Sequence, residues 1–251
     1  MSGAALLSAR GLGKRFGAVV AADDVNIDVP VGQRVSLIGS NGAGKTTFVN
    51  MVTGYLRPDA GSIELEGIDI TRLGHERIAG LGLCRSFQIP QLCVDLTVHE
   101  NLLVAVAAAA GRASLWRPAN AAAASRRADE LLARFGLEAQ AQRQAAELPG
   151  GMRKLLDIAM ALARRPKLLL LDEPTSGVSA DEKFPAMERV MEAIAGEPVT
   201  VLFVEHDMDI VARFSERVIA FYSGRVIGDG PPAEVLANAE VRKYVTGGVP
   251  P

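Results

Sequence analysis

The 251-residue sequence predicts an α/β fold in which helices cover a mostly parallel sheet. Apolar runs such as KLLLL at 167–171 and VTVLFV at 199–204 are uninterrupted, which is typical of strands buried on both faces. These runs alternate with segments of helical composition. In addition, a glycine-rich loop, GSNGAGKTT at 39–47, directly follows one of the expected strands. The sequence therefore predicts a ligand site at the carboxyl end of a buried strand.

Length and composition exclude several classes of protein. A chain of this length can bury a substantial core as one large α/β domain or two small ones. The formal net charge of −2 provides no global basic field for nucleic acid or an anionic membrane. The apolar run Leu102–Ala110 is too short to span a bilayer, and the N-terminus lacks secretory features. We expect a cytoplasmic protein in which Cys84 and Cys93 are reduced thiols rather than zinc ligands.

The order of the expected elements follows the hydrophobic pattern. Short β-rich runs at 25–30, 34–39, 61–67 and 81–87 predict half of the sheet. Alanine-rich segments then predict helices over 98–110 and 125–135, with Gly136 ending the second helix. The loop between these helices holds Trp116, the only tryptophan. Strands are expected again near 167–173, 199–206 and 217–224, and Ser179 and Glu182 mark the start of a helix at capping-box spacing.

The glycine-rich loop predicts phosphate binding. It matches the pattern G-x-x-x-x-G-K-[ST] at every fixed position, between a strand and a helix. Its glycines allow backbone N–H groups to point at one phosphate, and the helix adds its positive N-terminal end. Lys45 is expected to contact the β and γ phosphates, and Thr46 to supply a hydroxyl to Mg²⁺. The alternative, a glycine turn capping a helix beside a solvated lysine, is disfavoured by so complete a match.

A second set of motifs narrows the kind of nucleotide enzyme. The segment LPGGM at 148–152 lies twenty residues before Asp172, and Asp172 and Glu173 end the apolar run KLLLLDE. This combination resembles the ATP-binding-cassette ATPases over nearly the whole chain. The resemblance implies a P-loop NTPase (RecA-like) core with a mostly parallel sheet, an N-terminal antiparallel β subdomain and an inserted α-helical subdomain. We expect one domain, 1–251, with its core and β subdomain at 1–90 and 160–251 and its helical subdomain at 91–159.

The resemblance assigns roles to residues that would carry little meaning alone. It implies that Glu173 orients the water that attacks the γ phosphate, that His206 contacts this phosphate, and that Gln88 reaches the metal and the water. Without the resemblance, His206 would be read as a capping or surface histidine, and His75 and His99 are expected to be structural. The expected metal ligands are Thr46, Gln88 and Asp172. The expected ATP-binding residues are Phe16, Gly39, Ser40, Asn41, Gly42, Ala43, Gly44, Lys45, Thr46 and Thr47.

Phe16 occupies the place of the aromatic residue that stacks on adenine in the family. The alternative is a core phenylalanine, and in either case we expect a partly buried ring. The segment of Leu148, Pro149, Gly150, Gly151 and Met152 matches the family signature, which closes over the ATP bound to a second cassette.

The signature and the segment that follows Glu173 depart from the usual family form. The commonest signature is LSGGQ, so Pro149 and Met152 replace a serine and a glutamine. The lost hydroxyl donor to a phosphate predicts a weaker contact, by about 1.5 to 3 kcal/mol, and two unequal ATP sites. Ser179 stands where the family usually has Asp or Asn, which weakens the expected communication between the sites.

Four segments resemble branched-chain amino acid importers: VHENLLVA from Val98, the loop around Trp116, VEHDMDIV from Val204, and VRKYVTG from Val241. This resemblance implies an ATP- and Mg²⁺-dependent subunit on the inner face of the plasma membrane. Its partners would be a second cassette subunit, identical or different, membrane permeases and, indirectly, an external solute-binding protein, with no nucleic acid. Amide or urea importers use similar cassettes.

Two alternatives belong to other classes of protein. A soluble non-transport cassette acting on ribosomes or DNA would carry a second cassette or a long coiled-coil insertion, and neither is present in this sequence. A P-loop kinase or GTPase would leave the Gly-Gly turn, Glu173 and His206 unexplained.

Overall fold

The computed structural model describes residues 5–110 and 118–246, and the chain divides into two compact units. The first unit consists of Met1–Leu83 with Thr200–Pro251, and the second of Cys84–Val199. The predicted division into a core and a helical subdomain at 91–159 stays a prediction.

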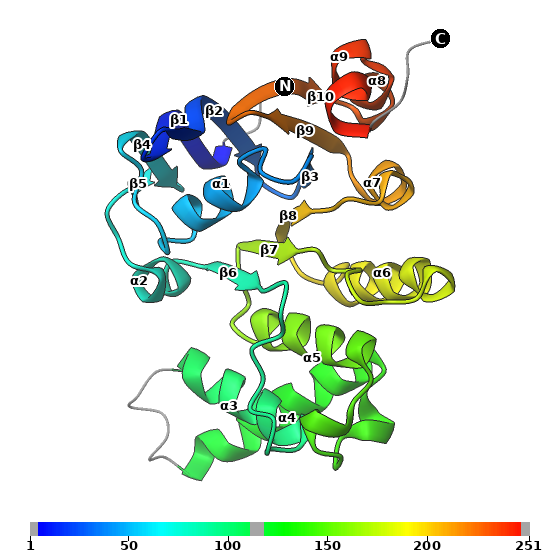
Figure 1. Ribbon diagram of the computed structural model, residues 1–251. Helices are drawn as coiled ribbons and strands as arrows, with labels where there is room; N and C mark the ends of the chain where they lie inside the picture. The colour runs from blue at the N-terminus through cyan, green and yellow to red at the C-terminus, as the bar shows by residue number, and fades with distance from the viewer. Residues whose placement is uncertain (1–4, 111–117, 247–251) are drawn as a thin grey trace. The chain divides into compact units, whose positions relative to one another are not determined.

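The first unit contains an antiparallel sheet with the strand order β2-β1-β4-β5 (Figure 1). Its strands are β1 (Ala5–Phe16), β2 (Val19–Pro30), β4 (Ala60–Leu65) and β5 (Ile68–Asp69). Leu7 of β1 lies opposite Val29 of β2 and Leu65 of β4, and all three side chains are buried. The expected N-terminal antiparallel β subdomain is therefore present, although β1 itself was not predicted.

A second sheet runs through the same unit. It includes β10 (Arg225–Gly230), β9 (Arg217–Tyr222), β3 (Arg34–Gly39) and β8 (Thr200–Val204), in that order. Strand β3 is parallel to both β8 and β9, and β10 is antiparallel to β9. The helices of the unit are α1 (Lys45–Val52), α2 (His75–Gly80), α7 (Met208–Phe214), α8 (Pro232–Ala237) and α9 (Ala239–Val241), followed by a π-helical turn at Arg242–Thr246.

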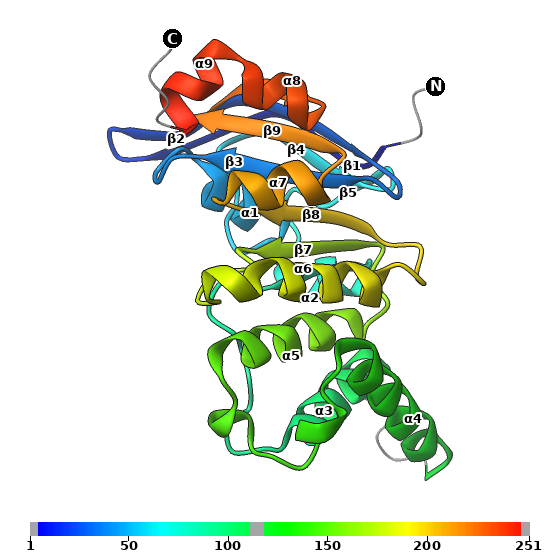
Figure 2. The same ribbon diagram turned by 90° about the vertical axis from the view of Figure 1, so that its right-hand side faces the viewer.

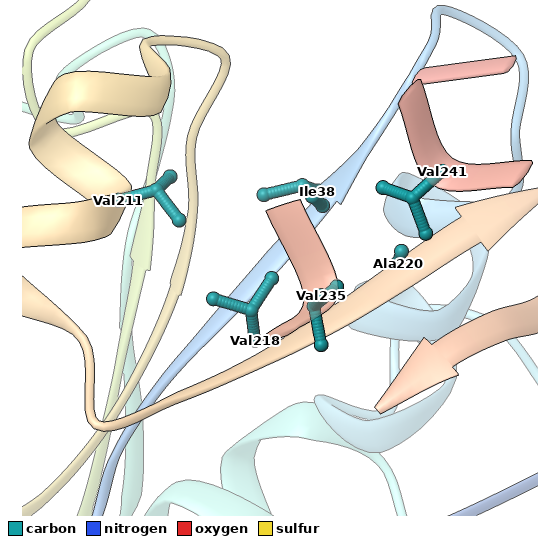
Figure 3. Packing of buried hydrophobic residues seen from close by; sticks show 6 residues of the cluster. All are labelled: Ile38, Val211, Val218, Ala220, Val235 and Val241. Atoms are coloured by element: carbon teal, nitrogen blue, oxygen red, sulfur yellow. The ribbon is translucent and has the colours of Figure 1, made fainter. Parts of the chain in front are cut away.

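Three of these helices bury apolar side chains against β3 and β9. Figure 3 shows Val211 of α7 and Val235 of α8 facing Ile38 of β3 and Val218 of β9. Val241 of α9 completes the same cluster, in which all members are buried. This packing is what the uninterrupted apolar strands predict, because a strand buried on both faces needs a helical cover.

The second unit is mainly helical (Figures 1 and 2). Its elements are β6 (Leu83–Ser86), α3 (Val98–Ala110), α4 (Pro118–Phe135), 3-10 turns at Glu138–Gln140 and Ala145–Glu147, α5 (Gly150–Leu162), β7 (Leu168–Asp172) and α6 (Ala180–Ile194). Helices α3, α4 and α5 pack on one another, and Leu102, Leu131 and Leu156 are fully buried. With the two sheets, these elements confirm the predicted fold class.

The observed helix boundaries can be compared with those predicted from the sequence. Helix α3 starts at Val98 as predicted and is described as far as Ala110, and α4, described from Pro118, contains the helix predicted over 125–135. Gly136 ends it with φ +64°. The loop around Trp116 lies outside the described residues. Helix α6 starts after Ser179 as expected, but the Ser179 hydroxyl donates to the Glu182 carboxylate at 2.9 Å instead of capping a backbone N–H.

Across residues 5–110 and 118–246, none of the helices has the length and apolar character needed to cross a bilayer.

Candidate active site

The phosphate loop joins β3 to α1 in the first unit, and its shape depends on glycine. Gly39 and Gly44 have φ values of +155° and +109°, which L side chains rarely adopt. A Cβ on Gly39 would lie 2.6 Å from the Phe221 carbonyl oxygen, and one on Gly44 would lie 2.5 Å from that of Ala21. Glycine is therefore required at both positions by the backbone conformation and by the nearby carbonyls of Phe221 and Ala21, and α1 begins directly afterwards.

Lys45 is buried against the loop that precedes it. Its Nζ donates to the Gly39 carbonyl at 2.6 Å and to the Ser40 carbonyl at 3.1 Å, and only 5% of the residue is exposed. The alternative of a solvated lysine is wrong, because the ammonium group is held over the loop. Thr46 is exposed and Thr47 is half-buried in the first turn of α1.

In the second unit, β7 ends at the two predicted carboxylates. Asp172 Oδ2 accepts a hydrogen bond from Arg85 at 2.5 Å, and about a tenth of each side chain is exposed. Glu173 follows with φ +48°, a left-handed conformation that is uncommon for a residue other than glycine. Such strained backbone positions cluster at functional sites. Arg85 was not singled out by sequence reasoning.

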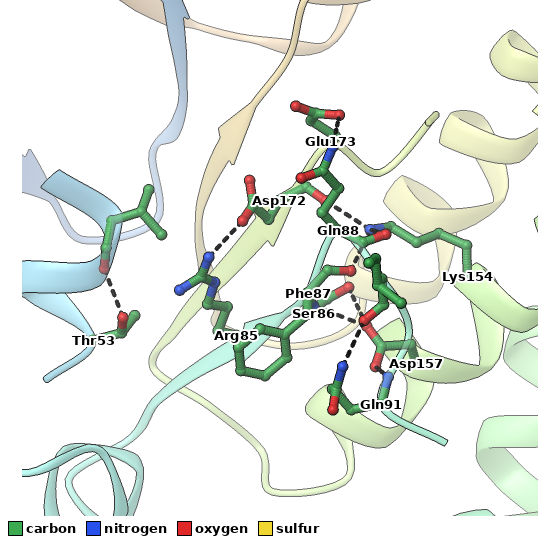
Figure 4. A network of polar contacts seen from close by, with 12 residues as sticks. Thr53, Arg85, Ser86, Phe87, Gln88, Gln91, Lys154, Asp157, Asp172 and Glu173 are labelled. Atoms are coloured by element: carbon green, nitrogen blue, oxygen red, sulfur yellow. Dashed lines mark hydrogen bonds and ion pairs between the residues drawn. The ribbon is translucent and has the colours of Figure 1, made fainter. Parts of the chain in front are cut away.

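Gln88 lies beside these carboxylates. Its side chain is exposed, and Nε2 donates to Glu173 Oε2 at 2.8 Å (Figure 4). Two predicted catalytic residues, 85 positions apart in the sequence, are therefore in contact. Lys154 and Asp157 of α5 are buried beneath the loop that carries Gln88, and sequence reasoning missed both. The available signal was two charges placed among the apolar residues of this helix.

The signature segment starts α5. Pro149 is the N-cap residue and makes no side-chain capping bond, Leu148 is buried, and Gly150 and Gly151 form the first turn. Neither glycine has a positive φ. A Cβ on Gly150 would lie 3.7 Å from the Gly177 carbonyl oxygen, and one on Gly151 would lie 3.6 Å from Val178, both ordinary contacts. The chain's own packing therefore does not require glycine here, in contrast to Gly39 and Gly44. Met152 is half-buried.

His206 and Phe16 lie in the first unit, and both are exposed. His206 follows β8, and its backbone N–H donates to Glu205 Oε2 at 3.0 Å. Asp207 caps α7 by accepting from the Asp209 N–H, which fixes the backbone next to His206. Phe16 ends β1 with 51% of its surface exposed, and the Lys14 ammonium lies 5.7 Å from its ring centroid. The core-phenylalanine alternative is wrong, and the ring is covered less than expected.

The remaining histidines and the cysteines lie elsewhere. His75 stacks on Tyr55 with ring centroids 4.6 Å apart, and His99 Nε2 lies 3.2 Å from Asp129 Oδ1. Cys84 and Cys93 are free thiols. Among the residues that the structure describes, no three His, Cys, Asp or Glu side chains gather as a metal cluster would require.

Comparison with known proteins identifies the family. The ABC transporter family profile matches residues 22–176. The chain is 36% identical over 249 residues to the high-affinity branched-chain amino acid transport ATP-binding protein LivG of Escherichia coli K12, covering 96% of this chain and 97% of LivG. It is 35% identical to the corresponding protein BraF of Pseudomonas aeruginosa, covering 96% and 98% of the two chains.

Solved structures agree with this similarity. The ADP conformation of MJ1267, an ATP-binding cassette of an ABC transporter, matches with a TM-score of 0.82 and 30% identity, covering 96% of this chain and 98% of that one. A dimeric, post-hydrolysis state of the cassette MJ0796 bound to ADP and phosphate matches with a TM-score of 0.78 and 25% identity, covering 90% and 98%. The chain therefore belongs to the ABC transporter family and is an ATP-binding cassette ATPase, as its motifs predict.

Proposed function

We propose that this chain hydrolyses ATP to drive an importer of branched-chain amino acids from the inner face of the plasma membrane. The contact of Gln88 with Glu173, directly after Asp172, is the single observation that carries the hydrolytic role. The cargo is proposed from the names of the LivG and BraF relatives. These relatives favour transport over the alternative of a soluble cassette that acts on ribosomes or DNA.

The phosphate loop would bind the nucleotide. Backbone N–H groups of the loop and the first turn of α1 would surround the β phosphate, and the Lys45 ammonium would exchange its carbonyl partners for phosphate oxygens. The exposed ring of Phe16 would stack on adenine, which needs an accessible face. Thr47 would lie near the α phosphate.

Glu173 would orient the attacking water, and Gln88 would hold this water and the carboxylate in place. Little covalent chemistry is required of the protein in phosphoryl transfer, so positioning and charge neutralisation carry most of the rate. His206 would donate to the γ phosphate as negative charge develops. Its exposed side chain and its capped backbone suit that role.

Thr46, Asp172 and Gln88 would hold Mg²⁺, which neutralises phosphate charge when bound. A hydroxyl, a carboxylate and an amide oxygen are ligands that Mg²⁺ takes together with substrate phosphates and waters, so no larger carboxylate cluster is needed. Because Gln88 donates through Nε2 to Glu173, its amide oxygen is the atom suited to a cation. Because Arg85 donates to Asp172 Oδ2, the other carboxylate oxygen of Asp172, Oδ1, would be the one to bind the cation.

A second cassette would supply the signature that closes over this nucleotide, and this chain's own signature would serve the partner. Gly150 and Gly151 support this exchange, since the chain's packing leaves room for a Cβ at both. Glycine in a helix costs roughly 0.5 to 1 kcal/mol relative to alanine. A ligand that approaches the backbone from outside the chain provides a reason to keep it.

Unequal ATP sites follow from Pro149 and Met152. Proline offers no hydroxyl and no N–H at the N-cap of α5, so only the helix dipole and the glycine N–H groups would meet the partner's phosphate. The site closed by this signature would therefore turn over more slowly than the site at this chain's own loop. Assembled-transporter ATPase that survives Glu173→Gln in this chain would rule out that inequality.

The permease would dock near the loop that carries Gln88. Ile89, Val94 and Val104 expose 75%, 49% and 46% of their surfaces in the second unit, and exposed apolar side chains are the kind that a membrane-protein helix covers. Motion of the loop would thus pass to the permease, while an external binding protein delivers the solute. Capture of ribosomes or DNA in place of a permease would contradict this proposal.

The function is tested with the complex that co-purifies with the chain from membranes. We expect Lys45→Ala to abolish ATP binding, because it removes the phosphate-binding ammonium. We expect Glu173→Gln to bind ATP normally, favour the closed dimer and lower hydrolysis by at least about 100-fold. Uptake of labelled leucine, isoleucine and valine into reconstituted vesicles, with urea and a short amide as competitors, tests the cargo. Unaltered hydrolysis in Glu173→Gln would contradict the role given to Glu173.

A further inference from the structure

Lys154 connects α5 to both segments that carry catalytic residues. Its Nζ donates to the Phe87 carbonyl at 2.6 Å, to the Asp172 carbonyl at 2.7 Å and, more weakly, to the Gln88 carbonyl at 3.5 Å. Only 2% of the residue is exposed. A buried ammonium group is costly unless acceptors surround it, so this side chain strongly favours the positions of the carbonyls that it contacts.

Asp157, three residues further along α5, holds the same loop by accepting hydrogen bonds from N–H and O–H groups of the loop. Its Oδ2 accepts from the Ser86 hydroxyl at 2.6 Å and from the Phe87 N–H at 3.0 Å. Its Oδ1 accepts from the Gln91 N–H at 3.1 Å. Burial raises the pKa of Asp157 against the lowering effect of these donors. The loop is thus held on both sides of Gln88 by one carboxylate.

These bonds leave the Gln88 side chain directed at Glu173. Figure 4 shows Lys154 and Asp157 reaching from α5 to the backbone of the loop, while the Gln88 amide points to Glu173. The other end of the Lys154 bridge is the carbonyl of Asp172, the residue before Glu173. The segments that carry Gln88 and Glu173 are therefore both hydrogen-bonded to side chains of one helix.

The same helix begins with the signature glycines. Gly150 and Asp157 are separated by seven residues of continuous helix, about 10 Å along its axis. A helix of this length moves as a rigid element, so a displacement of its first turn shifts the groups that Lys154 and Asp157 hold.

We propose that Lys154 and Asp157 are positioning residues that hold Gln88 and Glu173 at their working separation and fasten both to the signature helix. Neither side chain is placed against nucleotide, so both act through the residues that they hold. The proposal rests on the function proposed above, in which Gln88 and Glu173 serve one ATP site and the signature serves the other.

The test compares Lys154→Met, Lys154→Arg and the isosteric Asp157→Asn with Leu162→Ala in the co-purified complex. Leu162 is buried in the last turn of α5, so its truncation destabilises the same helix while leaving the side chains of Lys154 and Asp157 intact. We expect Lys154→Met and Asp157→Asn to lower kcat by about tenfold or more, with KM changed by less than about twofold. Lys154→Arg should recover part of the loss, and amide exchange at 86–91 should rise in Lys154→Met and Asp157→Asn.

A double-mutant cycle with Gln88→Ala separates positioning from general stability. Because Lys154 is inferred to act through Gln88 and Glu173, adding Lys154→Met to Gln88→Ala should lower kcat by much less than it does in the wild type. Two results would overturn the proposal. One is that the effects of Lys154→Met and Gln88→Ala on kcat multiply; the other is that Lys154→Met and Asp157→Asn match Leu162→Ala in kcat and in amide exchange of the loop. If Lys154→Met does not fold, Asp157→Asn and Lys154→Arg carry the same test.

The two proposals fail in different ways. A wild-type complex that neither binds nor hydrolyses ATP would refute the proposed function. Normal wild-type hydrolysis that Glu173→Gln abolishes but Lys154→Met leaves intact would refute only the positioning role.

Discussion

The phosphate loop of the first unit and the loop that carries Gln88 in the second unit are shaped by different means. The phosphate loop depends mainly on backbone, because Gly39 and Gly44 adopt conformations and close approaches that a Cβ would prevent, and Lys45 from the same motif adds bonds to its carbonyls. The loop at 86–91 depends on side chains, because Lys154 and Asp157 hold its carbonyls and N–H groups. The phosphate loop is thus restricted by residues of its own motif, whereas the loop at 86–91 is restricted by side chains of a separate helix, α5.

Buried charges follow the same division. The buried charged residues described in the first unit are Lys45 and Glu205, and those in the second unit are Arg127, Lys154, Asp157 and Asp172. Buried charges are costly unless each is well partnered, so they commit an element to one arrangement. Networks of charged side chains therefore determine more of the structure of the second unit, whereas backbone geometry and apolar packing determine more of the first.

The largest expected effect comes from a Cβ in the phosphate loop. We expect Gly44→Ala to lower the free energy of unfolding by at least about 3 kcal/mol and to abolish ATP binding, because strained φ and a 2.5 Å approach to the Ala21 carbonyl act together. Urea unfolding and equilibrium nucleotide binding measure both effects.

Gly17→Ala is the matched control for that substitution. Gly17 has φ +59°, and a Cβ on it would meet nothing within 4 Å, so it isolates backbone strain at about 1 kcal/mol. Equal losses of stability in the two variants would show that steric approach does not shape the phosphate loop, and the contrast between the two loops would disappear.

A smaller effect tests the charge networks of the second unit. Glu197 Oε1 accepts from Arg134 at 2.5 Å and from Arg127 at 2.8 Å, and Arg127 also donates to the Leu162 carbonyl. We expect Glu197→Gln to cost about 2 kcal/mol at pH 7, since two largely buried guanidinium groups lose their shared carboxylate. Glu130→Gln, at a half-exposed carboxylate, should cost less than about 1 kcal/mol.

The pH dependence of the stability difference between wild type and Glu197→Gln follows from the pKa of Glu197. Burial raises that pKa, but hydrogen bonds from Arg127 and Arg134 outweigh burial and hold it below the ordinary value of 4.5. The carboxylate therefore stabilises the fold above pH 4.5, and this contribution is lost as pH falls through the lowered pKa. The stability gap between wild type and Glu197→Gln should close below pH 4.5. A gap that widens in acid would contradict the assignment.

Local patterns predicted much of this fold, and contacts distant in sequence account for what they missed. Strands β3, β7, β8 and β9 and helix α3 follow continuous or periodic apolar residues, which packing on both faces dictates. Strand β1 was missed because Gly11, Gly13 and basic residues interrupt its pattern.

The candidate site divides in the same way. The phosphate loop could be located from the sequence because its motif lies in consecutive residues, and its contacts with nucleotide stay a prediction. Lys154 and Asp157 were missed because their partners lie 66 to 71 positions away in the loop and 18 positions away at Asp172, and no local pattern states what a buried charge will meet. The resemblance supplied Gln88, but not the residues that hold it.

The smallest expected effect comes from an exposed ion pair of the first unit, which is compared with the buried Glu197 network of the second. Arg10 donates to both oxygens of Asp28 at 2.6 Å, and this bond is the main reason that the pKa of Asp28 is lowered. Their side chains are 53% and 43% exposed, however, so water and salt screen the pair. We expect Asp28→Asn to cost about 0.5 kcal/mol in low salt and less in 0.5 M salt, measured by urea unfolding. A cost equal to that of Glu197→Gln would mean that an exposed ion pair stabilises the first unit as much as a buried one stabilises the second. Burial would then not decide how much an ion pair contributes to the free energy of unfolding.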